Sequence, residues 1–268
     1  MGPSASRVEA VAGRVRELAA HYAPPSFDHV PEPDAALFLC AIDHRSGYRE
    51  KHRVAGEGPY AGSALMWACA LEAARHDPER LTAARLRDVS GAEVAELLRA
   101  EGETVADPGR RAMLWRDLAE GLCREHDGRA RALLAAAGCR LGGEGGLLAL
   151  LAPYEAFSDP LRKKSFLFAK ICERRGWLEI TDPERWEVCA DNVLMRLALR
   201  SALVAPGPLA EVRAATREAF KRVAHRAGVS PPVLDDLLWE LGRDDPDLLG
   251  APAGDVREPP RDPESHWY

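Results

Sequence analysis

The feature that most constrains the fold of this chain is the recurrence of apolar residues at helical spacing, without any strand-length run of alternating apolar and polar residues. Apolar positions three to four residues apart indicate one buried face of a helix. The segments with this pattern are 6–22, 34–44, 61–75, 91–100, 107–126, 129–137, 160–175, 192–203, 208–227 and 231–241. The sequence therefore predicts an all-α fold, and it disfavours βαβ architectures.

Helix-start signals support these boundaries. Ser90-Gly-Ala-Glu93 is a capping box, and Asp159-Pro160 places a capping residue before a proline in the first turn. The glycine cluster 142–146 follows no strand and precedes no Lys-Ser/Thr pair. We therefore interpret the cluster as a flexible turn and not as a phosphate-binding loop.

Composition narrows the class of protein. With 268 residues, 46% of them hydrophobic, the chain has enough apolar material for a core. It has no run of about 18 apolar residues and no apolar leader at its start, so we expect neither a membrane span nor secretion. Its six cysteines form no Cys-x-x-Cys pair, which favours reduced thiols in a cytoplasmic protein without a metal. We expect no cofactor and a monomer.

The chain is expected to divide into an N-terminal helix and linker (1–32), a helical domain (33–243) and an acidic, Pro-rich tail (244–268). Within the domain we expect two lobes, at about 33–155 and 156–243. The tail carries seven acidic and two basic residues, so most of the net charge of −6 lies there. The body is close to neutral, unlike a strongly basic nucleic-acid binder. The tail is expected to be loosely ordered, with its last residues, 266–268, able to dock on the body.

Lys164 is the first residue whose position suggests chemistry. It shares a helical face with the apolar residues Leu161, Leu167, Phe168 and Ile171. A lysine on such a face either extends its ammonium to the rim or is buried for a purpose. Burial would lower the pKa of the amine and make it a nucleophile or base at neutral pH.

Asp191 is the second residue whose position suggests chemistry. It precedes a helix whose inward positions are Leu194, Met195 and Ala198, so its side chain lies on the same face. It is either an ordinary helix cap or a carboxylate that pairs with Lys164. An amine and a carboxylate in one dry pocket suit a reaction that develops positive charge on a sugar carbon.

Three segments around these residues resemble a known family. They are RKKSFLFAKI (162–171), ADNVLMRL (190–197) and AGVSPPVLDDLLWELGR (227–243). In this order they resemble the C-terminal half of archaeal 8-oxoguanine DNA glycosylases, which belong to the helix-hairpin-helix glycosylase superfamily. The resemblance implies a helix-hairpin-helix, DNA-glycosylase-like bundle with an active-site cleft between two helical lobes.

The resemblance also implies a reaction. Lys164 would attack the sugar C1′ and form a Schiff base, and Asp191 would stabilise the developing oxocarbenium charge. The product would be an oxidised guanine released from damaged DNA, with β-elimination as a possible further step. The superfamily's hairpin usually carries a Gly-x-Gly turn whose amides hold a DNA phosphate. The corresponding segment here is Phe157-Ser-Asp-Pro160.

A second resemblance implies a different substrate. The all-helical queuosine-salvage glycosylases use a lysine and a downstream aspartate to hydrolyse a free 7-deazaguanine nucleotide. Segments 62–71, 77–98 and 211–216 are compatible with their layout. The aspartate and the final helix favour the DNA glycosylase, whereas the near-neutral body favours the nucleotide hydrolase. We lean narrowly to the first, and a non-catalytic helical binding module is the third alternative.

Further residues are candidates for substrate binding. Trp177 and Trp186 lie in the connector between the two central residues and are expected to form pocket walls. The other candidates are Arg45, Tyr48, Lys163, Asn192 and Trp239. Asp43, His44 and His52 match no familiar metal signature, and we interpret 45–58 as a surface loop.

Overall fold

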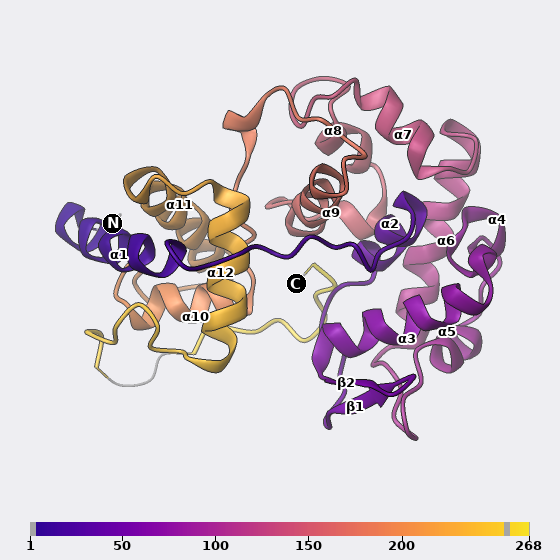
Figure 1. Cartoon of the computed structure of the whole chain (residues 1–268), viewed down its shortest axis with the longest axis horizontal. Coiled ribbons are helices and arrows are strands. Elements are labelled where there is room, and N and C mark those ends of the chain that lie inside the picture. Colours follow the sequence, from indigo (N-terminus) through magenta and orange to yellow (C-terminus); the bar gives the residue numbers. More distant parts are fainter. Residues whose placement is uncertain (1–3, 255–257, 268) are drawn as a thin grey trace. The chain divides into compact units, whose positions relative to one another are not determined.

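The computed structural model describes residues 4–254 and 258–267. Within these residues the chain forms twelve α-helices, three short 3-10 helices and one two-stranded antiparallel sheet (Figure 1). The prediction of a mainly helical protein is confirmed. The α-helices are α1 (Ala5–Ala19), α2 (Pro33–Ala41), α3 (Gly62–His76), α4 (Ala83–Leu86), α5 (Gly91–Leu97), α6 (Pro108–Glu125), α7 (Ala130–Ala137), α8 (Leu147–Leu151), α9 (Lys163–Arg174), α10 (Asn192–Arg200), α11 (Leu209–Ala227) and α12 (Pro231–Asp244).

The chain forms two compact units. The first, here called the α11 unit, combines the segment ending at Ser26 with Pro183–Ser265, and the second, the α9 unit, combines Phe27–Asp182 with the residues from His266. This division differs from the expected one. α9 packs against α2, and α1 packs against α11. The boundary therefore falls at 182/183, not at 155/156, and the N-terminal helix is part of a unit.

The core of the α9 unit is built around α2. All nine residues of α2 are buried, and the helix packs against α9, α6, α7 and α3. A helix that is apolar on every face is stable only when other elements surround it. The indole Nε1 of Trp115 on α6 donates to the Phe38 carbonyl of α2 at 2.7 Å, so this large side chain is buried with its polar atom satisfied.

In this unit, side chains supply hydrogen-bond partners for the free backbone amides at helix N-termini. The capping box at the start of α5 is confirmed: the Ser90 hydroxyl accepts from the Glu93 amide, and the Glu93 carboxylate accepts from the Ser90 amide. α7 receives its cap from a distant residue, because the Asp34 carboxylate accepts from the Ala130 amide at 2.5 Å. An N-terminal amide of a buried helix needs such a partner.

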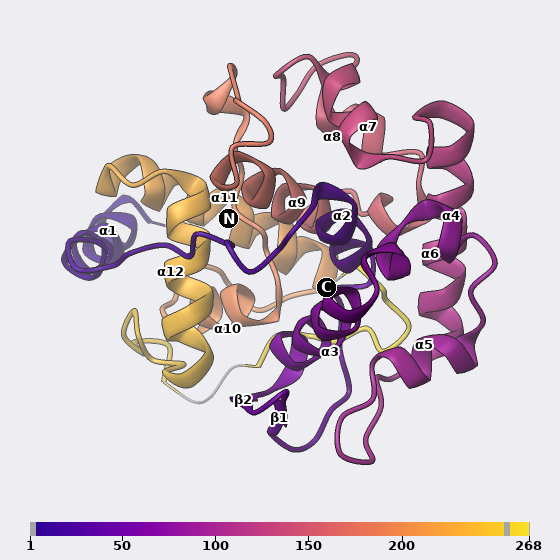
Figure 2. The same ribbon diagram turned by 45° about the vertical axis from the view of Figure 1, so that its right-hand side comes forward.

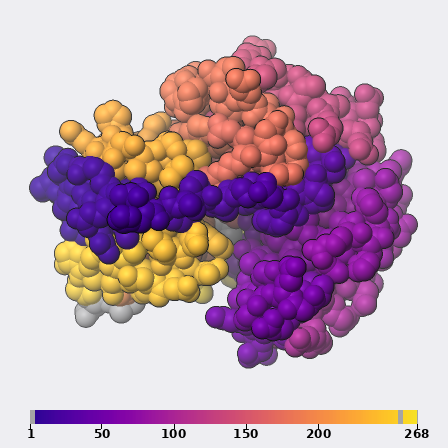
Figure 3. All heavy atoms as spheres, in the orientation of Figure 1, coloured from indigo at the N-terminus to yellow at the C-terminus, as the bar shows by residue number. Residues whose placement is uncertain are grey.

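A β-hairpin replaces part of the expected surface loop 45–58. β1 (His52–Val54) pairs with β2 (Glu57–Tyr60). Ala55 and Gly56 both have positive φ, as a two-residue hairpin turn requires. Strands of three and four residues are too short to show an alternating pattern, so the sequence did not reveal them. The hairpin lies on the visible surface in the space-filling view (Figure 3).

The glycine cluster forms a turn, as expected, and an internal anion holds it. The Asp182 carboxylate accepts from the Leu141 amide at 2.7 Å and from the Gly142 amide at 2.9 Å. Adjacent amides of this kind favour a negative charge. Here the carboxylate of the same chain supplies that charge.

In the α11 unit, α1 packs along α11, and α10 packs against α11 and α12 (Figures 1 and 2). Gly242 permits close approach of α12 to α10, because a Cβ at that position would lie 2.5 Å from a Leu197 methyl carbon. Arg7 fixes α1 by donating to the carbonyls of Ser201 and Leu249. Among the described residues, no helix combines the length and the apolar character that a membrane span requires.

Candidate functional site

Lys164 lies inside the α9 unit and not at its rim. Its side chain is 0% exposed. Its Nζ lies 2.6 Å from the carbonyl oxygen of Ala41 and 3.3 Å from Nδ1 of His44. Ala41 ends α2, and the last carbonyls of a helix have no partner within that helix. Of the two alternatives that helical spacing left open, burial is therefore the observed one.

The neighbouring lysine has a different environment. The Lys163 Nζ lies 3.0 Å from both the carbonyl oxygen and the Oδ2 of Asp43. Its charge is therefore balanced by a carboxylate, whereas the hydrogen-bond partners of Lys164 are both uncharged groups. Consecutive residues on a helix point in directions about 100° apart, so two adjacent lysines reach different partners.

Burial lowers the pKa of the Lys164 amine well below its ordinary value, and the charge of Lys163 adds to this effect. The Asp43 carboxylate opposes it, but Lys163 holds that carboxylate. A lowered pKa favours the free amine, which is the nucleophilic form.

His44 completes this cluster. It is buried, and burial together with the charges of Lys164 and Arg111 strongly lowers its pKa, so its ring is neutral. Arg111, fully buried on α6, fixes the backbone of the same turn by donating to the carbonyls of His44 at 2.6 Å and Arg45 at 2.9 Å. From the sequence, Asp43 and His44 were considered only as metal ligands and were placed at the end of the predicted helix 34–44. Their position at the end of an apolar helix was the available signal.

The end of the chain joins the same cluster. His266 is buried, and its ring lies edge-on to that of His44, with centroids 6.3 Å apart. The docking that was expected of 266–268 is thus observed for His266 and Trp267, while Tyr268 lies outside the described residues. Sequence patterns did not indicate that this docking would occur beside Lys164.

Asp191 is the N-cap of α10 in the α11 unit. Its carboxylate accepts from the Leu194 amide at 3.0 Å, and the residue is partly exposed. The capping role that the sequence suggested is therefore observed. Lys164 belongs to the α9 unit, so the expectation that the two residues share one site stays a prediction.

The predicted substrate-binding residues divide between the units. In the α9 unit, Tyr48 donates to the Leu98 carbonyl, Arg45 is exposed, and the Arg175 guanidinium lies 5.2 Å from the ring centre of Trp177. The α9 unit also holds Lys163. The α11 unit holds Trp186, Asn192 and Trp239.

In the α11 unit Trp186 is buried, and Trp239 is partly exposed with Arg243 against its ring. Asn192 begins α10, and its Oδ1 has no hydrogen-bond partner among the described residues. None of these observations assigns a substrate contact, so the roles remain predictions.

The helix that carries Lys164 begins later than expected, at Lys163 and not at 160. Arg162 has a positive φ, and the buried Asp159 carboxylate folds back over the helix start. Its oxygens accept from the amides of Leu161 at 3.0 Å and Lys163 at 3.1 Å. The anion at this helix start is therefore a side chain of the protein.

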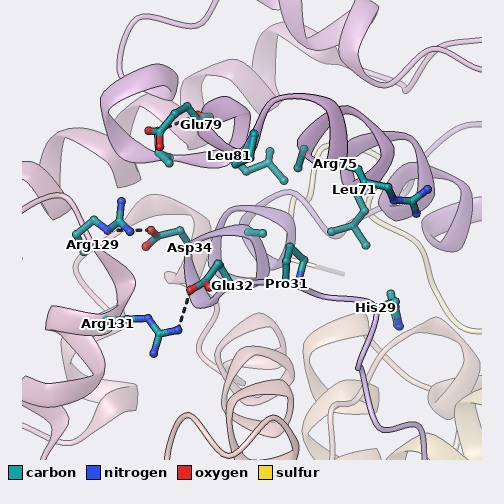
Figure 4. A pocket seen from close by; sticks show the side chains of 14 residues that line it. His29, Pro31, Glu32, Asp34, Leu71, Arg75, Glu79, Leu81, Arg129 and Arg131 are labelled. Carbon is teal, nitrogen blue, oxygen red and sulfur yellow. Dashed lines mark hydrogen bonds and ion pairs between the residues drawn. The ribbon is translucent and has the colours of Figure 1, made fainter.

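A groove of about 620 Å³ opens elsewhere in the α9 unit (Figure 4). Its arginines are balanced by acids: Arg129 lies 3.2 Å from Asp34, and Arg131 lies 2.8 Å from Glu32. Its lining includes neither Lys164 nor His44. No group of three or more His, Cys, Asp or Glu side chains suited to a metal ion occurs in residues 4–254 and 258–267.

The chain was also compared with known proteins. No family model matches the sequence, and no curated protein matches it significantly, so the function has to be argued from the cluster around Lys164.

Proposed function

We propose that this protein cleaves the N-glycosidic bond of a modified purine, with the amine of Lys164 as the nucleophile. One observation carries the proposal: a fully buried lysine whose Nζ has only a backbone carbonyl and a neutral imidazole as hydrogen-bond partners among the described residues. Retaining an ammonium in such surroundings is costly unless it is paired with an anion. A site of this kind favours the free amine.

The contacts of Nζ support attack through its lone pair. In the free amine, one N–H donates to the Ala41 carbonyl and the other to Nδ1 of His44. The lone pair is then left for an electrophile. The sugar C1′ of a nucleoside is such an electrophile once its bond to the base begins to break.

The proposed reaction balances without a cofactor. Nζ forms a bond to C1′ while the bond from C1′ to the base breaks, and the bonding electrons leave with the base. The base takes up the proton that Nζ gives up. Water then adds at C1′ and releases the free amine and the sugar.

The start of α9 favours a free nucleotide as the substrate. In the helix-hairpin-helix superfamily this hairpin usually offers backbone amides to a DNA phosphate. Here the Asp159 carboxylate accepts from two amides at that place, and it would repel a phosphate. The near-neutral charge of the body also favours a free nucleotide, because phosphate contacts dominate non-specific affinity for DNA. We therefore place a 7-deazaguanine nucleotide of the queuosine type first.

Damaged DNA is the second candidate for the substrate. The order of the three segments that resemble archaeal 8-oxoguanine DNA glycosylases favours it. In that reading the sugar stays within the strand, and the covalent intermediate with Lys164 permits strand cleavage by β-elimination.

The experiment compares both substrates directly. The protein is incubated with queuosine 5′-phosphate and, separately, with duplex DNA containing 8-oxoguanine, and base release is followed by mass spectrometry. Borohydride is added to trap a lysine adduct. We expect release from the free nucleotide and a loss of at least about 10³-fold in Lys164→Gln.

Lys221→Gln is the matched control, because Lys221 lies on α11 and pairs with Glu187 at the surface. It should keep wild-type activity. Release from the DNA alone would reverse the order of the two candidates. Activity retained by Lys164→Gln, or no release from either substrate, contradicts the proposal, and in the latter case the chain is better described as a binding module.

A further inference from the structure

The last described residues of the chain form what we call the C-terminal tip, His266 and Trp267. His266 is 7% exposed although it follows a Pro-rich, charged tail. Trp267 secures the tip by donating from Nε1 to the Ser158 hydroxyl at 3.3 Å, and its ring lies edge-on to that of His266.

The hydrogen-bond partners of His266 indicate which of its ring nitrogens carries the proton. Its Nε2 lies 2.9 Å from the carbonyl oxygen of Glu155, which only accepts hydrogen bonds. Its Nδ1 lies 3.1 Å from the Arg110 guanidinium, which only donates. The ring is therefore neutral, with its proton on Nε2. The Glu155 carboxylate lies 3.7 Å from Nε2, but it is paired with Arg110 at 2.9 Å. A second proton on Nδ1 would face the positive charge of Arg110, and burial also lowers the pKa of His266.

The tip lies beside the residue that orients the Lys164 amine. The His266 ring contacts that of His44 in a T-shaped arrangement, with an interplanar angle of 79°. The neighbouring groups that lower the pKa of His44 are Lys164, Arg111, His266 and Lys163. All of them are basic, so a proton added to His44 would have no nearby anion to balance it except Asp43, which Lys163 already holds.

We propose that His266 is a positioning residue for Lys164: held by Glu155 and Arg110, it keeps His44 in the neutral form whose Nδ1 accepts from the amine. This rests on the proposed function only for its effect on catalysis. Its effect on His44 is independent of that function and follows from the ring contact and the basic surroundings. If His44 loses this neighbour, water enters, His44 takes up a proton at higher pH, and Nδ1 can no longer accept from Nζ.

The first test does not depend on activity. Long-range ¹⁵N NMR of the histidine rings in the full chain reports which nitrogen carries the proton. In the wild type we expect His44 and His266 to keep their protons on Nε2 down to pH 5.5. In His266→Ala, we expect the His44 ring to take up its second proton at a higher pH than in the wild type, because His266 is one of the groups that lower its pKa. His44 rings that behave identically in both proteins overturn the proposal.

Two further variants separate positioning from simple damage. In His266→Asn, the side-chain oxygen takes the place of Nδ1 and can still accept from Arg110, so it should restore part of the wild-type behaviour of His44. Glu264→Gln is the matched control, because this exposed tail residue makes only a backbone contact with Asp262. A Glu264→Gln variant that changes His44 as much as His266→Ala does contradicts a specific role for His266.

The second test is the pH profile of base release. In His266→Ala we expect about a tenfold loss at pH 6.5 and a much smaller loss at pH 9, because His44 is neutral again at high pH. A loss that is equal at every pH indicates a merely structural role and overturns the positioning role. If the NMR changes occur as expected but neither substrate reacts even with the wild type, the proposed function fails while the control of His44 by the tip stands.

Discussion

His44 and His52 lie eight residues apart in the chain, yet the α9 unit gives their rings opposite electrostatic surroundings. His44 faces Lys164, Arg111 and other basic groups. His52, at the start of β1, has Nδ1 3.2 Å from the Glu101 carboxylate and Nε2 3.0 Å from the Glu103 carboxylate. Both ring nitrogens of His52 therefore face groups that only accept, which requires a proton on each.

The pKa values follow these surroundings. Burial lowers the pKa of His44 strongly, and the neighbouring positive charges lower it further. The hydrogen bonds to Glu103 and Glu101 raise the pKa of His52. The comparison teaches that neither the residue type nor its place near the same apolar helix decides the charge of a histidine. The partners that the fold brings from other helices decide it.

The largest expected effect comes from removing the cation that fixes the His44 turn. Arg111→Met keeps the aliphatic bulk but leaves three carbonyls, those of Ala106, His44 and Arg45, without their donor. We expect the free energy of unfolding to fall by about 3 kcal/mol. Urea unfolding measures this change, with the exposed Arg124→Met on the same helix as a control. A loss no greater than in that control would show that Arg111 does not hold the turn.

The second effect concerns the pH dependence of stability at His44. Because its folded pKa lies below the ordinary value of 6.5, the unfolded state binds a proton in acid that the folded state does not. Below pH 6.5 the wild type should therefore lose about 1.4 kcal/mol per pH unit through this residue. His44→Gln, which cannot titrate, should show a correspondingly flatter acid limb in urea unfolding. Parallel pH profiles for the two proteins would mean that His44 is protonated in the folded state.

The smallest expected effect is the contribution of His52 to the pH dependence of stability, and its sign is opposite to that of His44. Its folded pKa is raised, so its contribution to stability is complete below pH 6.5 and is lost as the pH rises through the folded pKa. His52→Gln should therefore destabilise the protein at pH 5.5 more than at pH 9. The exposed His225→Gln on α11 is the control for the measurement. A difference that grows with pH would rule out the doubly protonated ring.

Much of the fold was predictable because its signals are local. Apolar spacing located most of the helices, and the capping box at Ser90 placed the start of α5 correctly. The helical face of Lys164 also showed that the residue stands among apolar neighbours. What spacing left open was whether the ammonium extends to the surface. That depended on the end of α2, whose terminal carbonyl accepts from Nζ.

The rest of the cluster depends on long-range contacts. His266 reaches Glu155 across 111 positions of the chain, and Arg111 reaches the His44 carbonyl across 67. Such pairs leave no periodic trace in the sequence. The hairpin was missed because its strands are too short for a pattern. Asp159 was visible as a capping residue type, but its hydrogen bonds to the amides of Leu161 and Lys163 were not.

The sequence by itself determined that the chain is mainly helical, where most of the helices lie, and that a lysine stands on an apolar face of one of them. These properties follow from local spacing and from the hydrogen-bonding needs of helix ends. Only the tertiary structure decided that this lysine is fully buried, that its partners are uncharged, and that His266 lies beside His44. Electrostatic surroundings arise from groups that are distant in sequence, so they exist only once the helices have packed.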